Sequence, residues 1–135
     1  MDRRSFLIAS LAASAAGPVL AGAGEEYVPG MVTKKLADGE VVLVDFYATW
    51  CTTCKRQERV IGALRSQNPD YEAISFVAVD WDQHSRSDLA RSLRIPRRST
   101  LVVLTKDGEL GRIVAGTSTR DIQALMDVAL AAAVA

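Results

Sequence analysis

Four short apolar runs predict the strands of this chain. Residues 41–47 are an almost unbroken β-branched and apolar run, which is typical of a strand covered on both faces in a parallel sheet. Residues 74–79 predict a second strand of the same kind. The runs 101–104 and 110–115 flank an Asp-Gly turn within 106–109, a pattern that favours an antiparallel hairpin.

Longer segments with apolar residues at helical spacing predict the helices. The first extends from Cys51 to about Gln67, where Asn68-Pro69-Asp70 ends the pattern. Others are expected over 85–93 and about 119–134, and 31–37 fits a short lead-in helix. The alternation of strands and helices indicates one α/β domain.

The first 23 residues predict a targeting peptide. A positive start with Arg3-Arg4 precedes an apolar stretch that ends in Ala21-Gly22-Ala23. These are the three parts of a cleavable secretory signal, and the arginine pair resembles the twin-arginine type. We expect cleavage near Ala23-Gly24, which leaves 24–135 as the mature domain in the periplasm; an uncleaved membrane anchor is the alternative.

Composition narrows the class of partner. Lys plus Arg and Asp plus Glu both total 16 in 135 residues, so charge gives no reason to expect a nucleic acid or an anionic membrane surface as partner. Nothing in the sequence suggests a nucleotide, flavin or haem site, so no cofactor is expected, and the chain is expected to be a monomer. Partner choice must therefore depend on the local surface.

The only two cysteines, Cys51 and Cys54, lie where the first long helix begins. Unpaired N–H groups and the helix dipole at that end stabilise a thiolate, so Cys51 is expected to have a lowered pKa and to attack a substrate disulfide. Cys54, one turn further, is expected to resolve the mixed disulfide and form a redox-active disulfide with Cys51.

A cysteine pair of this spacing can also form a structural disulfide, a zinc site or a copper(I) site. A structural disulfide across so short a loop removes little entropy from the unfolded chain. A zinc site needs about four ligands, and only His84 joins the two cysteines as a soft candidate. A non-enzymatic copper(I) carrier that uses both thiolates, with or without His84, stays open as a competing hypothesis.

Residues 44–55, Val-Asp-Phe-Tyr-Ala-Thr-Trp-Cys-Thr-Thr-Cys-Lys, closely resemble the active-site strand and turn of the thioredoxin superfamily. The resemblance covers about residues 31–133. It implies a thioredoxin fold, α/β with three layers (α/β/α) and a central mixed sheet of about four strands. The same segment is similar to the C-terminal domain of the periplasmic reductase DsbD, which implies reducing chemistry outside the cytoplasm.

The resemblance also implies roles for residues around the cysteines. Trp50 matches the aromatic flank of the substrate surface, and Asp45 matches a buried acid that assists proton transfer from the resolving cysteine. The lysine that faces this acid in thioredoxin is Ala78 here. The substrate-facing position that holds a cis-proline in the family corresponds to Pro96 in one alignment, and to Thr100 or its neighbour Ser99 in the other, which we favour.

These inferences combine into one functional hypothesis. The chain is expected to be a periplasmic thiol:disulfide oxidoreductase that reduces protein disulfides and receives electrons from a membrane donor of the DsbD or CcdA kind. A disulfide-forming oxidase is the enzymatic alternative, although Thr52-Thr53 lacks the histidine that oxidising relatives carry between their cysteines. Arg97 and Arg98 are expected near the site, where they either favour an acidic partner, stabilise the thiolate, or are solvated.

Overall fold

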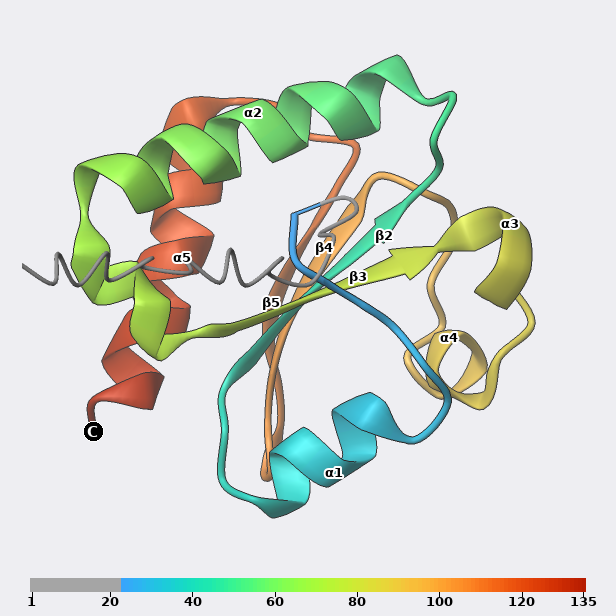
Figure 1. Ribbon diagram of the computed structural model, residues 1–135, viewed down its shortest axis with the longest axis horizontal. Helices are drawn as coiled ribbons and strands as arrows, with labels where there is room; N and C mark the ends of the chain where they lie inside the picture. Colours follow the sequence, from blue (N-terminus) through green and yellow to red (C-terminus); the bar gives the residue numbers. More distant parts are fainter. Residues whose placement is uncertain (1–22) are drawn as a thin grey trace, which may run out of the picture.

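The computed structural model describes residues 23–135, which form a sheet with helices on both faces (Figure 1). The leader expected over residues 1–23 lies outside this range except for Ala23. None of the helices between residues 23 and 135 has the length and hydrophobicity that a membrane span requires.

The strands of the described part are β1 (Glu25–Glu26), β2 (Val42–Tyr47), β3 (Ser75–Asp80), β4 (Thr100–Thr105) and β5 (Gly108–Val114). They lie in the order β1-β3-β2-β4-β5. The first three are parallel, and β4 and β5 are antiparallel to their neighbours. The expected mixed sheet is confirmed, with β1 as a fifth strand that the apolar pattern did not predict.

The helices are α1 (Met31–Ala37), α2 (Thr52–Gln67), α3 (Trp81–His84), α4 (Asp88–Ser92) and α5 (Thr119–Ala133), with a 3-10 turn, η1 (Pro69–Ala73). The helix expected over 85–93 is present as the shorter α4, and α3 just before it was not predicted. The reason is local capping: the Asp80 carboxylate accepts the Asp82 N–H at 2.9 Å, and the Ser87 hydroxyl accepts the Ala90 N–H at 3.2 Å.

All six residues of β2 are buried, as predicted for a central strand. Its alternate side chains enter two apolar layers. Leu43 packs with residues of α2, η1 and α5 on one face, whereas Val42, Val44 and Phe46 pack with residues of α1 and α4 on the other. Figure 1 shows this division, with α2 and α5 on one side of the sheet and α1 and α4 on the other. The strand is thereby fixed, and with it the start of α2.

The short strand β1 is attached to the sheet by a close contact. Gly24 lies against β3, and a Cβ at this position would be 2.3 Å from the Phe76 carbonyl oxygen. Only glycine fits such an approach without displacing the chain. This contact brings the Ala23 backbone over the sheet beside Asp45, which links the edge of the fold to the centre described next.

Candidate active site

Cys51 is the N-cap residue of α2, immediately after β2 and a three-residue turn. Its backbone is extended (φ −87°, ψ 114°), and its Sγ accepts the Cys54 N–H at 3.1 Å. A sulfur thus takes the place that a serine or aspartate oxygen usually holds at a helix start. Cys54 lies one turn inside the helix, and both residues are free thiols with almost no exposed surface.

The surroundings of the two thiols give Cys51 a lower pKa than Cys54. Burial by itself would raise the pKa of the Cys51 thiol, but hydrogen bonds with the Cys54 thiol, the Ser99 hydroxyl, the Cys54 N–H and Arg98 lower this pKa to about 7. Burial, followed by the neighbouring Cys51 sulfur, raises the pKa of Cys54. The expected assignment of Cys51 as the thiolate therefore agrees with the geometry.

Ser99 stands between the two sulfurs. Its Oγ lies 3.1 Å from Cys51 Sγ and 3.0 Å from Cys54 Sγ. Ser99 is fully buried and has a φ of 62°, in the left-handed region that non-glycine residues rarely occupy. From the sequence, Ser99 was a candidate for the substrate-facing position only as the neighbour of Thr100. Its contacts to the cysteines could not be predicted, because they span 48 and 45 positions of the chain.

Gln57 holds the loops around Ser99, and no sequence motif identifies it as a functional residue. The fully buried Gln57 Nε2 donates to the Ser99 carbonyl oxygen at 3.0 Å and to the Gly116 carbonyl oxygen at 2.9 Å. Its position in the helix could have identified it, because this polar residue lies on the same buried face of α2 as Cys54, Ile61 and Leu64. An amide there ties the segment before β4 and the segment after β5 to α2.

The structure separates the two alternatives for the substrate-facing position. Thr100 is buried as the first residue of β4, and its hydroxyl donates to the Arg97 carbonyl oxygen at 2.7 Å. Pro96 is exposed in the loop after α4, and every peptide bond within residues 23–135 is trans. Of the residues weighed for this position, Ser99 is the one with contacts to both sulfurs.

The exposed Trp50 and the half-buried Arg98 form the rim beside Cys51. The guanidinium carbon of Arg98 lies 4.3 Å from the centre of the Trp50 ring, a cation–π arrangement. The indole Nε1 donates to Asp82 at 2.9 Å, yet Trp50 is 58% exposed. Because Arg98 also contributes to the low pKa of Cys51, it connects this rim to the thiolate. Arg97 is held by a 3.0 Å bond from its Nε to the Arg98 carbonyl oxygen.

Asp45 is completely buried in the middle of β2. Its Oδ2 accepts the Ala23 N–H at 3.2 Å, whereas Oδ1 has no partner among the described residues. Desolvation, with smaller contributions from Glu58 and Cys51, raises the pKa of Asp45 to about 8 despite the Ala23 bond. Ala78 is its register partner on β3, so an apolar methyl group replaces the family lysine there.

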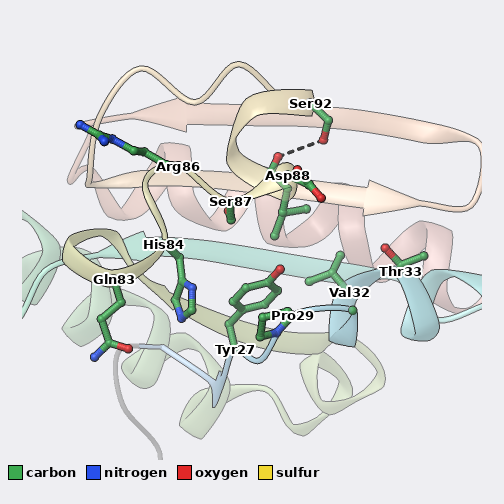
Figure 2. A pocket seen from close by; sticks show the side chains of 12 residues that line it. Tyr27, Pro29, Val32, Thr33, Gln83, His84, Arg86, Ser87, Asp88 and Ser92 are labelled. Atoms are coloured by element: carbon green, nitrogen blue, oxygen red, sulfur yellow. Dashed lines mark hydrogen bonds between the residues drawn. The ribbon is translucent and has the colours of Figure 1, made fainter.

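His84 belongs to a different part of the molecule. It packs edge-on against the Tyr27 ring at 5.0 Å between centroids, and both residues line a pocket of about 700 Å³ (Figure 2). Other residues of α1, α4 and their flanking loops complete this pocket, and neither cysteine lines it. Within residues 23–135 no three His, Cys, Asp or Glu residues gather in an arrangement that could hold a metal ion.

An acidic thiol at a helix start, a second thiol one turn away and a three-layer α/β/α framework define a dithiol–disulfide oxidoreductase site. Comparison with known proteins agrees. The family model described as Thioredoxin matches residues 29–128, and the chain belongs to the thioredoxin family. It is accordingly a thiol:disulfide oxidoreductase with Cys51 and Cys54 as its CxxC pair.

Individual relatives show how close this similarity is. Mitochondrial thioredoxin-2 of Schizosaccharomyces pombe is 33% identical over 97 residues, which are 72% of this chain and 68% of that protein. A thioredoxin of Echinococcus granulosus is 33% identical over 88 residues, 64% of this chain and 78% of its own. The crystal structure of Trxlp from Edwardsiella tarda superimposes with a TM-score of 0.64 at 34% identity, covering 76% of this chain and 94% of that one.

The buried carboxyl of Asp45 predicts a distinctive pH dependence of stability. In the unfolded chain this group loses its proton near its ordinary pKa of about 4. In the folded chain the proton stays until about pH 8. Between these values the unfolded state releases a proton that the folded state keeps, so Asp45 makes the protein progressively less stable as pH rises from about 4 to about 8.

Asp45→Asn should therefore be more stable than the parent at pH 8, by more than about 1.4 kcal/mol, the equivalent of one pKa unit. The advantage should shrink toward pH 4. Urea unfolding at both pH values measures it, with the exposed turn variant Asp107→Asn as the matched control. An Asp45→Asn difference that is the same at pH 4 and pH 8 would contradict the assignment of a protonated, buried Asp45.

Proposed function

We propose that this chain is an exported protein-disulfide reductase in which Cys51 attacks the substrate and Cys54 releases it. The observation that carries the proposal is the shared environment of the two sulfurs. Cys51 Sγ accepts the helix N–H of Cys54 at 3.1 Å and has a pKa near 7, so a large fraction is thiolate at neutral pH. Cys54 is held one turn away with a raised pKa, ready for the second step.

The reaction has two exchange steps. The Cys51 thiolate attacks one sulfur of a protein disulfide; a Cys51–substrate disulfide forms, the substrate S–S bond breaks, and the released thiolate takes a proton from water. Cys54 then loses its proton and attacks Cys51 Sγ. The Cys51–Cys54 disulfide forms, the Cys51–substrate bond breaks, and the second substrate thiolate leaves. Two electrons pass to the substrate, and the enzyme leaves oxidised.

Asp45 is the proposed acceptor of the Cys54 proton in those molecules in which its carboxyl is ionised, a fraction that grows as pH approaches 8. Its pKa of about 8 places it close to the pKa of a thiol, so that proton transfer between them is nearly balanced. Ala78 replaces the lysine that would hold the carboxyl ionised. The Ala23 N–H bond is the only hydrogen bond to the Asp45 side chain within the described residues, which makes the β1 side of the sheet part of the environment of this carboxyl.

The reducing direction is supported by the residues between the cysteines. Thr52 and Thr53 supply no positive charge, unlike a histidine, which would stabilise the reduced thiolate and make the couple more oxidising. A periplasmic reductase leaves each cycle oxidised and therefore needs electrons from the cytoplasmic side. We assign that role to a membrane donor of the DsbD or CcdA kind.

Substrate docking is proposed at the rim formed by Trp50, Arg97 and Arg98. The exposed indole offers an apolar surface beside the thiolate, and the Arg98 guanidinium keeps the ring in place at 4.3 Å. Two adjacent arginines next to an indole favour a substrate segment with acidic residues near its cysteine. Thr100 and Pro96 remain proposed contributors at the edge of this surface.

The proposal that the chain is exported is based on the leader, and it predicts that export depends on Arg3 and Arg4. In a bacterium with a twin-arginine pathway, the full chain should reach the periplasm in a shortened form. Conversion of both arginines to lysine, which preserves charge, should retain it in the cytoplasm at full length, whereas Asp2→Asn should be exported normally. Immunoblots of periplasmic and cytoplasmic fractions measure this, and equal export of the lysine variant would refute the twin-arginine assignment.

The exchange mechanism predicts opposite behaviour for the two cysteine variants. The purified protein should catalyse reduction of insulin by dithiothreitol, and Cys51→Ser should abolish this activity because no attacking thiolate remains. Cys54→Ser should also stop turnover, but it should accumulate mixed disulfides through Cys51, visible by mass spectrometry and reversed by reductant. Trapping through Cys54 in the Cys51→Ser variant would overturn the assignment of roles.

A further inference from the structure

The position of Ser99 assigns it a part in the chemistry that the two-cysteine scheme leaves out. A hydroxyl has one hydrogen to donate and two lone pairs to accept with. Ser99 Oγ lies within hydrogen-bond distance of both sulfurs, at 3.1 Å and 3.0 Å. In each state of the reduced enzyme with one thiolate and one thiol, this hydroxyl can therefore donate to the thiolate and accept from the thiol.

We propose that the Ser99 hydroxyl is a catalytic group that stabilises the thiolate of Cys51 and of Cys54 in turn. The inference rests on the proposed exchange function and adds a residue to it. In the resting reduced enzyme, Oγ–H donates to the Cys51 thiolate while the Cys54 S–H donates to Oγ. The position that the family reserves for a proline, which has no side-chain donor, thereby becomes an active polar group.

In the mixed disulfide the hydroxyl serves the second cysteine. Cys51 Sγ is now bonded to the substrate and carries no charge, so Oγ–H turns about the Cβ–Oγ bond and donates to Cys54 Sγ as Cys54 loses its proton. The Cys54 thiolate attacks Cys51 Sγ, the enzyme disulfide forms, and the substrate thiolate departs. No proton is consumed by Ser99, which ends the cycle as the same hydroxyl.

The backbone around Ser99 is built to hold this geometry. Its N–H donates to the Phe46 carbonyl oxygen at 2.7 Å, and its own carbonyl oxygen accepts the Ala115 N–H at 2.8 Å and Gln57 Nε2 at 3.0 Å. These bonds tie it to β2, to the end of β5 and to α2. They also maintain the left-handed φ of 62°, whose cost is typically about 1–3 kcal/mol for a non-glycine residue.

Ser99→Ala and Ser99→Gly together separate chemistry from structure. Both remove the hydroxyl, but glycine accepts the left-handed backbone without strain whereas alanine does not. Ser87→Ala is the matched control, because it deletes another structural serine hydroxyl, the N-cap of α4, that has no contact with a sulfur. The first readout is the pH dependence of Cys51 alkylation by iodoacetamide, followed by mass spectrometry.

Loss of one hydrogen bond to a thiolate should move the alkylation midpoint upward by about one pH unit, from a starting value near 7. Alkylation at pH 6 should accordingly fall about tenfold in both Ser99 variants, with no change in Ser87→Ala. The second readout is the rate at which Cys54 releases a small aromatic thiol from a preformed mixed disulfide with Cys51. This rate should fall about tenfold in both Ser99 variants, because the Cys54 thiolate also loses one hydrogen bond.

The outcomes distinguish this inference from the proposed function. If the parent reduces insulin but Ser99→Gly keeps both the alkylation midpoint and the release rate, the Ser99 inference is wrong and the exchange function stands. If the midpoint rises while release is unchanged, the role at Cys54 is overturned. If the parent fails to reduce insulin, the proposed function fails, while a raised alkylation midpoint would still support the hydrogen bond from Ser99 to Cys51.

Discussion

The hydrogen bond from the Cys54 N–H to Cys51 Sγ is the interaction on which the site depends. It makes a cysteine the cap of α2, so the charge that completes the helix is also the nucleophile. The cap can hold its place only because β2 before it is buried on both faces and cannot shift. Core packing on this strand therefore sets the position of a sulfur atom.

Chain segments distant in sequence then surround that sulfur. Ser99 arrives from the loop before β4, and Gln57 from the buried face of α2 binds the carbonyl oxygens of Ser99 and Gly116. Arg98, adjacent to Ser99, reaches outward to stack on Trp50. One loop therefore presents a buried hydroxyl to the thiols and a half-buried cation to the exposed Trp50 ring, which couples thiolate stability to the proposed docking surface.

The pattern of apolar and polar residues was sufficient to predict those elements whose structure is determined by residues close in sequence. The apolar run of β2, the long amphipathic α2 and the Asp-Gly hairpin were predicted from sequence and are present, as is the placement of both cysteines at the helix start. Sequence reasoning missed β1, because two glutamates carry no strand pattern and form a strand only by pairing with β3. It also missed α3, because the Asp80 side chain that caps this short helix was assigned to a loop.

The site residues likewise fall into those that a local motif identifies and those that depend on contacts between distant segments. Cys51, Cys54 and Trp50 follow one another around the turn, so a motif identifies them. The contacts of Ser99 and Gln57 depend on how the segments before β4 and after β5 meet α2, which no local stretch of sequence records. For Asp45, the apolar strand around it predicted burial, while its bond to the Ala23 N–H depended on an edge strand that was not foreseen.

The reduction potential of the Cys51–Cys54 couple tests the central claim most directly. Trp50, next to Cys51, provides a fluorescence probe for titration in buffers of reduced and oxidised glutathione. A value near the roughly −270 mV of thioredoxin is predicted, because Thr52 and Thr53, between the cysteines, carry no positive charge that would strongly favour the reduced form. A value near the roughly −120 mV of a strong oxidant would contradict the reductase account and assign the protein to disulfide formation.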